Sequence, residues 1–492
     1  MSVGAARALG GLLITILGVT VGAWLLLLRP VPQPPTHDPL QRFNHGSIGN
    51  EGAQGIPYWI WRVLPQVFPQ HLPGNQDGYA SIGLFWRPGE ELPVGMTQKT
   101  LGVIPRVSIN CAFCHQGSYR VSPTEPAVHV TGGAGSRVNP QGYIRFLGNV
   151  GSDPRFTSAA IMDAILAIYD MPAWERVLYR FLLIPATRSA LIEQKRRMAW
   201  TESRPDWGPG RIDPFNPVKF RNLRLGDDGT IGNSDMMPLW GLNHERTDPS
   251  REYSLHWDGL NRSLREVVVS GAIGDGMDYK TWPLVREQVL GIEDSARLMT
   301  PPPSPFSSTR DPGDPFYVAE GDVLAGRALY ERHCADCHSP RGSRFRTVIP
   351  AHEMGTDRHR LAMWSEPARE RYADYDRDGG YRWDFRRFHN EDGYVAVELS
   401  GLWLKGPYLH NGSVPHLKDL LEPAESRPRT FFRGYDLVDA DSGGFVSQGP
   451  LAERHGWEFD TALPGNSNAG HEIGVGLGKA EKARLLGYLK TL

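Results

Sequence analysis

Apolar side chains recur at helical spacing in three stretches of this chain. Residues 158–198 show this spacing, with interruptions at Pro172 and Pro185. Residues 320–338 predict a second helix, and residues 479–492 predict an amphipathic helix at the C-terminal end. Strict alternation of apolar and polar residues, which is typical of half-buried strands, is sparse. The pattern therefore predicts a mainly α protein whose helices are joined by long irregular loops.

An unbroken apolar run covers residues 8–28, which carry no charge and lie between Arg7 and Arg29. As a helix, the run is long enough to cross the ~30 Å hydrocarbon layer of a membrane. A cleaved signal peptide and a buried core helix are the alternatives. Because the run extends beyond its small residues, we expect an uncleaved single-pass anchor in the inner membrane. Residues 1–7 would then be cytoplasmic, and the bulk of the chain would lie in the periplasm.

Two proline-rich segments divide the remaining chain. Residues 29–39 predict a stiff tether after the expected anchor. Residues 301–315 predict a linker between a first domain, 40–300, and a second domain, 316–492. We therefore expect two domains behind one N-terminal transmembrane helix.

Composition narrows the classes of protein that this chain could belong to. Its 492 residues include 55 glycines and 40 prolines, which disfavours a coiled coil, a helical repeat array or a collagen-like fibre. The 53 basic and 55 acidic residues give a net charge of −2, so no nucleic-acid partner is expected. Four cysteines are too few for a disulfide scaffold. Their positions are more informative than their number.

All four cysteines lie in two copies of one motif, C-x-x-C-H. The first copy is Cys111-Ala-Phe-Cys114-His115, and the second is Cys334-Ala-Asp-Cys337-His338. This motif is the attachment signature of c-type haem. Two thiols one helical turn apart can each form a thioether with a haem vinyl group, and the following histidine can ligate the iron. We therefore predict two covalently bound haem c groups, with His115 and His338 as proximal ligands.

Two other uses of the cysteine pairs are less consistent with the spacing. Zinc ribbons usually separate their two pairs by ~15–20 residues, whereas Cys114 and Cys334 stand roughly 220 positions apart. Neither a zinc site nor a redox-active dithiol requires a histidine directly after both pairs. His333, which precedes the second motif, is expected to be a surface residue or a neighbour of a haem propionate.

The second half of the chain carries a more specific pattern. It contains PYLHNGSVP at 407–415, PRTFFRG at 428–434 and PGNSNAGHEIG at 464–474. This arrangement resembles the bacterial di-haem cytochrome c peroxidase superfamily, and within it the branch of the di-haem rubber oxygenases. The resemblance covers most of the chain after residue 39. It implies two cytochrome c-like haem domains with one haem each.

The resemblance also implies ligands for the second haem. In the rubber oxygenases this haem has two histidine ligands, and the far one lies close to the C-terminus. The matching residue here is His471, which lies between Gly470 and Gly474 in a turn that can approach a flat ring closely. His410, in the YLHNGS segment, is expected to line the haem pocket and is the alternative ligand.

The far side of the first haem is expected to determine the function. The resemblance implies an open site lined by Trp240 and Trp257, which could also relay electrons, although ordinary core packing explains tryptophans equally well. His256 departs from the apolar lining of a rubber oxygenase and could ligate iron or act as an acid–base group. His129 is a second candidate for a removable ligand.

Two weaker signals concern ligands of other kinds. Arg211 could bind a haem propionate, although a structural ion pair explains it equally well. Asp374, Asp376 and Asp378 resemble the start of a calcium loop, and the peroxidases of this superfamily hold calcium. Phe385 stands at the position where an EF-hand needs glutamate, which excludes an EF-hand. Calcium bound in another way is kept as a candidate cofactor beside haem.

Together these expectations define a membrane-anchored periplasmic di-haem oxidoreductase that acts on peroxide or dioxygen. One haem would transfer electrons with a protein of the respiratory chain, and the other would meet the oxidant. The alternatives are a non-enzymatic di-haem electron carrier and a dioxygenase that cleaves an unsaturated organic substrate. A polar His256 disfavours cleavage of polyisoprene itself.

Overall fold

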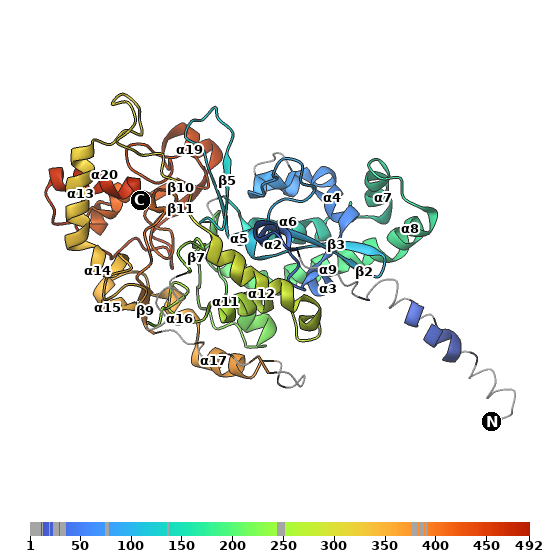
Figure 1. Ribbon diagram of the computed structural model, residues 1–492. Helices are drawn as coiled ribbons and strands as arrows, with labels where there is room; N and C mark the ends of the chain where they lie inside the picture. The colour runs from blue at the N-terminus through green and yellow to red at the C-terminus, as the bar shows by residue number, and fades with distance from the viewer. Residues whose placement is uncertain are drawn as a thin grey trace.

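The computed structural model describes most of the chain after residue 35. The described residues are 11, 13–18, 20–22, 29, 36–73, 78–134, 137–243, 251–375, 377, 382–383, 385, 388 and 391–492. Helices, short sheets and long loops alternate along these segments (Figure 1).

Helices make up most of the regular structure. They are α2 (Pro39–His45), α3 (Glu51–Gln54), α4 (Tyr58–Val67), α5 (Cys111–Cys114), α6 (Pro140–Ser152), α7 (Ser158–Leu166), α8 (Ala173–Leu178), α9 (Ile184–Arg197), α11 (Leu264–Gly274), α12 (Trp282–Leu298), α13 (Glu320–His333), α14 (Ala335–His338), α15 (Ala351–Met354), α16 (His359–Met363), α17 (Glu366–Ala373), α18 (Leu417–Leu420), α19 (Gly449–His455) and α20 (Lys479–Thr491). Two π-helical turns are η4 (Tyr179–Leu183) and η6 (Val218–Asn222).

Short antiparallel strands connect parts of the chain that are distant in sequence. One three-stranded sheet, in the order β1-β3-β2, contains β1 (Ile56–Pro57), β2 (Met96–Leu101) and β3 (Ile104–Ile109). The pairs are β4 (Gln116–Tyr119) with β5 (Val128–Thr131), β6 (Arg211–Ile212) with β7 (Ser234–Asp235), β8 (Val348–Pro350) with β9 (Gly393–Val395), and β10 (Thr430–Arg433) with β11 (Trp457–Asp460).

The three predicted helical regions are helical in the structure, and two of them are divided into shorter helices. Residues 158–198 form α7, α8, η4 and α9, and the first break ends at Pro172. Residues 320–338 form α13 and α14, separated at Cys334, and α20 occupies Lys479–Thr491. Helices α13 and α20 lie side by side (Figure 1), so closely that a Cβ on Gly326 would lie 2.1 Å from the carbonyl oxygen of Arg484.

The predicted fold class is corrected in two respects. Five small sheets run through the described residues, so the protein combines helices with strands and is not simply mainly α. These strands span only two to six residues each, and such short segments leave little alternation in the sequence. The second respect concerns the N-terminal segment.

No helix within the described residues is long and apolar enough to span a bilayer. This finding corrects the predicted transmembrane helix over residues 8–28, and with it the predicted single-pass inner-membrane localisation. Within the apolar run, the described residues are 11, 13–18 and 20–22, and they are helical. Its other positions, residues 1–7 and most of the 29–39 tether lie outside the described residues.

The hydrophobic core contains residues from both sides of the proposed linker. One cluster joins Phe43, Trp240 and Val289 to Trp403 and Phe445. The segment 301–315 itself packs on the protein, since the Ser304 hydroxyl donates to the Lys490 carbonyl at 2.6 Å. The division into domains 40–300 and 316–492 stays a prediction, and the contacts above show that the two parts share a core.

A buried carboxylate fastens the strand β4 region to the C-terminal part of the chain. Asp436 is 1% exposed and accepts hydrogen bonds from Ser118 at 2.8 Å and from Nε of Arg120 at 2.7 Å. Arg137 lies 3.3 Å away from the same carboxylate. Burial raises the pKa of Asp436, but the charges of Arg137 and Arg120 and the hydrogen bonds outweigh it, so the pKa is lowered.

Replacing this carboxylate should destabilise the protein. We expect Asp436→Ala to lower the free energy of unfolding by about 2–3 kcal/mol, because two arginines lose a buried partner. Denaturant unfolding above pH 6 measures the loss. Because the folded-state pKa is lowered, the difference between variant and wild type should disappear as the pH falls through that pKa. Glu193→Ala, which removes an exposed partner of Arg196, should change the free energy by less than about 0.5 kcal/mol. An equal loss in both variants would contradict the prediction.

Candidate haem-binding site

The first C-x-x-C-H motif is presented by a one-turn helix at the end of a strand. Asn110 stands between β3 and α5, and its side-chain oxygen accepts a hydrogen bond from the Ala112 N–H at 3.0 Å. Its amide nitrogen donates to the carbonyls of Phe43 and Gly46, at 2.9 and 3.1 Å. Asn110 is thus both the N-cap of α5 and its attachment to α2. The sequence analysis did not single out this residue.

The thiols of both motifs are unpaired and partly buried, and their environment favours the neutral form. Burial, with the charge of Asp275, raises the pKa of Cys111 to about 12. Burial raises the pKa of Cys334 to about 11. Within the described residues, no three His, Cys, Asp or Glu side chains gather closely enough to hold a metal ion.

The two motif histidines are oriented in the same way. Nδ1 of His115 donates to the Met237 carbonyl at 2.8 Å, and Nδ1 of His338 donates to the Val397 carbonyl at 2.7 Å. A proton on Nδ1 leaves Nε2 as the free nitrogen of a neutral ring. Burial lowers the pKa of both rings, which favours this neutral state. Each motif therefore presents one imidazole nitrogen that is ready to ligate a metal.

His471 lies opposite His338. The centres of the two rings are 6.1 Å apart, and the ring planes are inclined by 48°. Two metal–imidazole bonds of about 2 Å, with about 1 Å from each nitrogen to its ring centre, add up to about 6 Å. Nδ1 of His471 is buried without a hydrogen-bond partner. The pair is therefore spaced to clamp one metal ion from both sides.

The backbone turn around His471 holds it in this place. His471 has a φ of 50°, and its N–H donates to the Met354 carbonyl at 2.8 Å. The preceding Gly470 has a φ of 81°, and a Cβ there would lie 2.4 Å from backbone atoms of Met354 and Gly355. Only glycine fits this crossing of two backbones. Burial and the charge of His338 lower the pKa of His471 to about 4, so the ring is neutral.

His410 lies elsewhere in the buried region. Its ring stacks on Tyr394, with ring centres 3.9 Å apart and planes inclined by 16°. Its Nε2 is buried without a partner, and burial, with the charges of Arg360 and Arg211, lowers its pKa well below the usual value. Among the described residues, the His410 ring does not contact the His338 ring. The imidazole that faces His338 is that of His471.

Three buried arginines have N–H groups without acceptors. Arg211 is 0% exposed, and only its Nη2 is paired, with Asn466 at 2.8 Å; its Nε and Nη1 have no partner. Nε is likewise unpaired in Arg433 and Arg360. Burial and the charge of Arg433 lower the pKa of Arg211 to about 9, which still leaves it charged at neutral pH.

These arginines extend the predicted role of Arg211. Arg433 pairs with Asp235 at 2.5 Å, and Arg360 donates to Ser234 at 2.5 Å and pairs with Asp258 at 3.3 Å. Buried guanidinium groups normally satisfy their N–H groups, so the unpaired ones mark places for an anionic partner. Haem propionates provide such a partner. Arg360 and Arg433 carry no local motif, and only the fold reveals them.

His256 lies in a buried setting beside Phe215 and Asn261. Its ring lies 5.9 Å from that of Phe215, and its Nε2 donates to the side-chain oxygen of Asn261 at 3.1 Å. Burial, with the charge of Arg360, lowers the pKa of His256 to about 4, and the charge of His115 makes a smaller contribution in the same direction. Its φ of 62° lies in the left-handed region, which is uncommon for a residue other than glycine. The strained backbone and the Asn261 contact together fix the direction of this imidazole.

The two predicted tryptophans occupy different places. Trp240 is buried, three residues after Met237, and its indole nitrogen has no partner. It packs against Gly401, where a Cβ would lie 2.6 Å from the ring. Trp257 is half-buried and donates from its indole nitrogen to the Asp235 carbonyl at 2.8 Å. Neither packs against the ring of His115 in the described structure.

The remaining candidates lie away from the facing histidines. His129 pairs with Gln116 at 3.3 Å and stacks on Phe85, with ring centres 4.9 Å apart. His333 is exposed at the end of α13. Asp376 and Asp378 of the proposed calcium turn lie outside the described residues.

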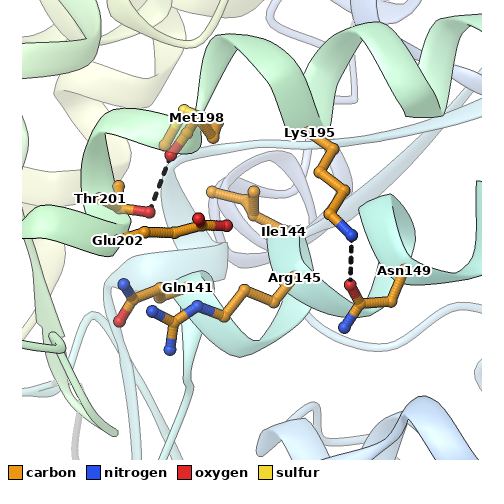
Figure 2. A pocket seen from close by; sticks show the side chains of 8 residues that line it. All are labelled: Gln141, Ile144, Arg145, Asn149, Lys195, Met198, Thr201 and Glu202. Carbon is orange, nitrogen blue, oxygen red and sulfur yellow. Dashed lines mark hydrogen bonds between the residues drawn. The ribbon is translucent and has the colours of Figure 1, made fainter. Parts of the chain in front are cut away.

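A separate cavity of about 300 Å³ lies between α6 and α9 (Figure 2). Its charged walls are occupied by local contacts: Arg145 pairs with Asp206 at 2.6 Å, and Lys195 donates to Asn149 at 2.9 Å. None of its lining residues belongs to either haem motif. It therefore plays no part in the haem-binding site.

Comparison with known proteins connects the second half of this site to a family. Residues 393–432 match a family described as RoxA-like, cytochrome c-like. The matched segment contains Val397, which orients His338, and His410. This cytochrome c-like match implies covalently bound haem c and supports a relation, at a coarse level, to rubber-oxygenase-like cytochromes.

Two proteins of Sinorhizobium fredii (strain NBRC 101917 / NGR234) are similar to parts of the chain. The uncharacterized protein y4iJ is 47% identical over 108 residues, which are 20% of this chain and 18% of that protein. The uncharacterized protein y4iM is 36% identical over 155 residues, which are 27% of this chain and 35% of that protein. The chain thus covers much less than two thirds of the length of either relative.

The facing histidines give a direct prediction. His471→Gly should convert one low-spin haem of the purified protein to a high-spin or water-ligated form, because its far ligand is lost. Electron paramagnetic resonance of the oxidised protein measures the change, and added imidazole should restore the low-spin signal by occupying the gap. His410→Gly is the matched control and should leave the low-spin signal in place. If the control lost the signal and His471→Gly kept it, the far ligand would be His410.

Proposed function

We propose that this chain is a di-haem c-type cytochrome that acts as an oxidoreductase on peroxide or dioxygen. Each of its two proposed domains, 40–300 and 316–492, would hold one haem. When bound, haem c supplies one-electron redox chemistry and a metal face that can meet a small oxidant. The observation that carries the proposal is an asymmetry. His338 is faced by a second imidazole, whereas His115 is not faced in this way by any ring in the described residues.

The centre at His338 and His471 is suited to electron transfer. Two neutral imidazoles that clamp one metal leave no position for a substrate. The backbone contacts of His471 and the carbonyl of Val397 hold both rings in place, which keeps reorganisation small when an electron arrives or leaves. An electron-donor or electron-acceptor protein of the respiratory chain is the partner that this role requires.

The centre at His115 is suited to a reaction. His256 is near enough for the charge of His115 to affect its pKa, and the pKa of about 4 keeps the imidazole neutral. Asn261 fixes the ring through Nε2. A neutral, oriented imidazole can accept a proton from an incoming peroxide and return it to the leaving oxygen. We therefore assign His256 as the acid–base group, with Phe215 and the Asp258–Arg360 pair as its surroundings.

A continuous set of contacts joins the two proximal histidines. Trp240 follows the Met237 segment that supports His115, and its ring lies 6.0 Å from Nζ of Lys405. Nζ of Lys405 donates to the Glu398 carbonyl at 2.5 Å. Glu398 is bonded to Val397, which supports His338. We therefore assign Trp240 as the aromatic group that relays electrons between the centres, whereas Trp257 packs with Ala351, Leu361 and Tyr394.

A non-enzymatic electron carrier is the second candidate. In such a carrier His256, whose neutral imidazole is buried and whose pKa the charge of His115 affects, would ligate the first metal and close that centre as well. A carrier of this kind would show only low-spin haems and no response to peroxide.

Counting haems and their spin states tests the proposal. We expect two haems per chain by the pyridine haemochrome assay, one of them low-spin and the other responsive to cyanide or peroxide. Cys111→Ala with Cys114→Ala should remove the responsive haem and retain the low-spin one. The matched pair, Cys334→Ala with Cys337→Ala, should do the reverse. The proposal would be contradicted by a single haem in the wild type, or by two low-spin haems whose spectra change with neither cyanide nor peroxide.

The role of His256 is tested by the rate of reaction with hydrogen peroxide. His256→Ala should lower the second-order rate constant about 10²-fold or more, because the proton transfer loses its carrier. Stopped-flow absorbance at the haem bands measures the rate. His129→Ala is the control and should leave it unchanged. An unchanged rate in His256→Ala would show that His256 is not the acid–base group. A lowered rate in His129→Ala would assign that role to His129.

A further inference from the structure

A helical face at the edge of the molecule is apolar and exposed to solvent. It is formed by α8, η4 and α9, and it includes Trp174, Val177, Phe181 and Leu182, which are 55%, 59%, 71% and 46% exposed. Ile192, ten residues beyond Leu182 on α9, is 44% exposed. Monomeric soluble proteins rarely leave several large apolar side chains together on one helix, so this face requires a partner. We call it the α8–α9 face.

The geometry of the helices makes the face continuous. Helices α8 and α9 and the π turn η4 follow one another without a gap between residues 173 and 197. Trp174, Val177 and Phe181 are three and four residues apart, so they share one side of the helix. Tyr179 and Leu183 point the other way and are 0% and 4% exposed in the core. The core thus holds one side of this helical run, and the opposite side faces solvent.

The polar residues of this helical run are mainly basic. Residues 173–197 contain six basic and two acidic residues, in a chain whose net charge is −2. Arg176 and Arg180 are exposed and lie one turn apart beside Val177 and Phe181. Arg176 also pairs with the exposed Asp170 at 3.4 Å and donates through Nε to the Met171 carbonyl at 2.7 Å. The other four basic residues of the run bond to partners within the chain. Arg180 makes no ion pair within the described structure, and its guanidinium lies 5.9 Å from the ring of Phe181. The apolar face is therefore flanked by positive charge.

The face also lies apart from the haem-binding site. Figure 1 shows α7 and α8 at the edge of the molecule remote from α13, α14 and α20, which carry and surround the second motif. No residue of the α8–α9 face belongs to either haem motif or to the set of unpaired arginines. Its exposure is therefore unexplained by the proposed redox function and does not depend on it.

We propose that the α8–α9 face binds the surface of a bilayer that contains anionic phospholipids. The helix would lie in the plane of the interface without spanning it, with Trp174, Val177 and Phe181 among the upper acyl chains. Arg176 and Arg180 would then reach the phosphate groups. An exposed aromatic and aliphatic stripe beside basic residues has the composition of such interfacial helices. A self-associating face would instead need an acidic partner surface for its arginines, and this run supplies only two acidic residues.

A local fluorescent probe tests this proposal on the full haem-loaded chain. A Phe181→Cys variant carries an environment-sensitive nitrobenzoxadiazole label on the new cysteine. With mixed phosphatidylcholine and phosphatidylglycerol vesicles, its emission should shift to the blue and increase several-fold. Pure phosphatidylcholine should give a weaker response. The matched control is Leu324→Cys on α13, where the native side chain is 62% exposed, and its label should not respond. The unsubstituted chain, labelled in parallel, gives the background from the motif cysteines.

The readout distinguishes this face from other modes of binding. Vesicle binding through another part of the chain would leave the label at position 181 unchanged and would overturn the proposal. An equal response at both labels, or a response that grows with protein concentration without lipid, would also overturn it, the latter in favour of a second copy. In unlabelled protein, Val177→Ser with Phe181→Ser should weaken vesicle partitioning about tenfold or more. Leu324→Ser should have no effect, and unchanged partitioning of the double variant would count against the face.

Discussion

The haem-binding site depends on two hydrogen bonds from motif histidines to backbone carbonyls. His115 is tied to Met237 and His338 to Val397, in each case through Nδ1. The bond selects the tautomer, points Nε2 away from the support, and fixes the plane of the ring. Because each carbonyl belongs to a segment distant from its motif, the local C-x-x-C-H geometry becomes useful only once the tertiary fold has formed.

The same dependence on distant segments governs the charges around the site. Asp235 and Arg211 meet across the short β6–β7 ladder, and Arg433 arrives from β10 to pair with Asp235. Burial raises the pKa of Asp235 to about 6, although the two arginines act in the opposite direction. Burying such groups is costly, and the unpaired guanidinium N–H groups of Arg211, Arg360 and Arg433 have the chemistry to receive an anionic group such as a haem propionate.

Part of this arrangement is visible in the sequence, and part is not. The two C-x-x-C-H motifs are local in sequence. Their residue types and spacing are therefore enough to predict both the motif residues and the one-turn helices that carry them. His471 was assigned through the resemblance to the rubber oxygenases, and its flanking glycines, which allow a close backbone approach, agree with that assignment; its ligation of a metal stays a prediction. The hydrogen-bond acceptors of the two imidazoles are the backbone carbonyls of Met237 and Val397. Any residue provides a carbonyl, so the sequence does not mark these two positions. Sequence motifs do not single out Arg360, Arg433 or Asn261 either, because only tertiary contacts distinguish them from surface residues. The prediction for the N-terminal run rested on apolarity and length alone, and no membrane-spanning helix is found among the described residues.

The turn that carries His471 bears on how the protein matures. It closes over His338 only after the chain has been completed past residue 471, more than one hundred residues beyond the second motif. Until then the slot between the two rings is open on one side, which gives a flat macrocycle a way in. A cofactor held by both His338 and His471 would join α14 to this final turn and so stabilise the C-terminal part. Cofactor loading would thereby be coupled to the closure of the turn around His471.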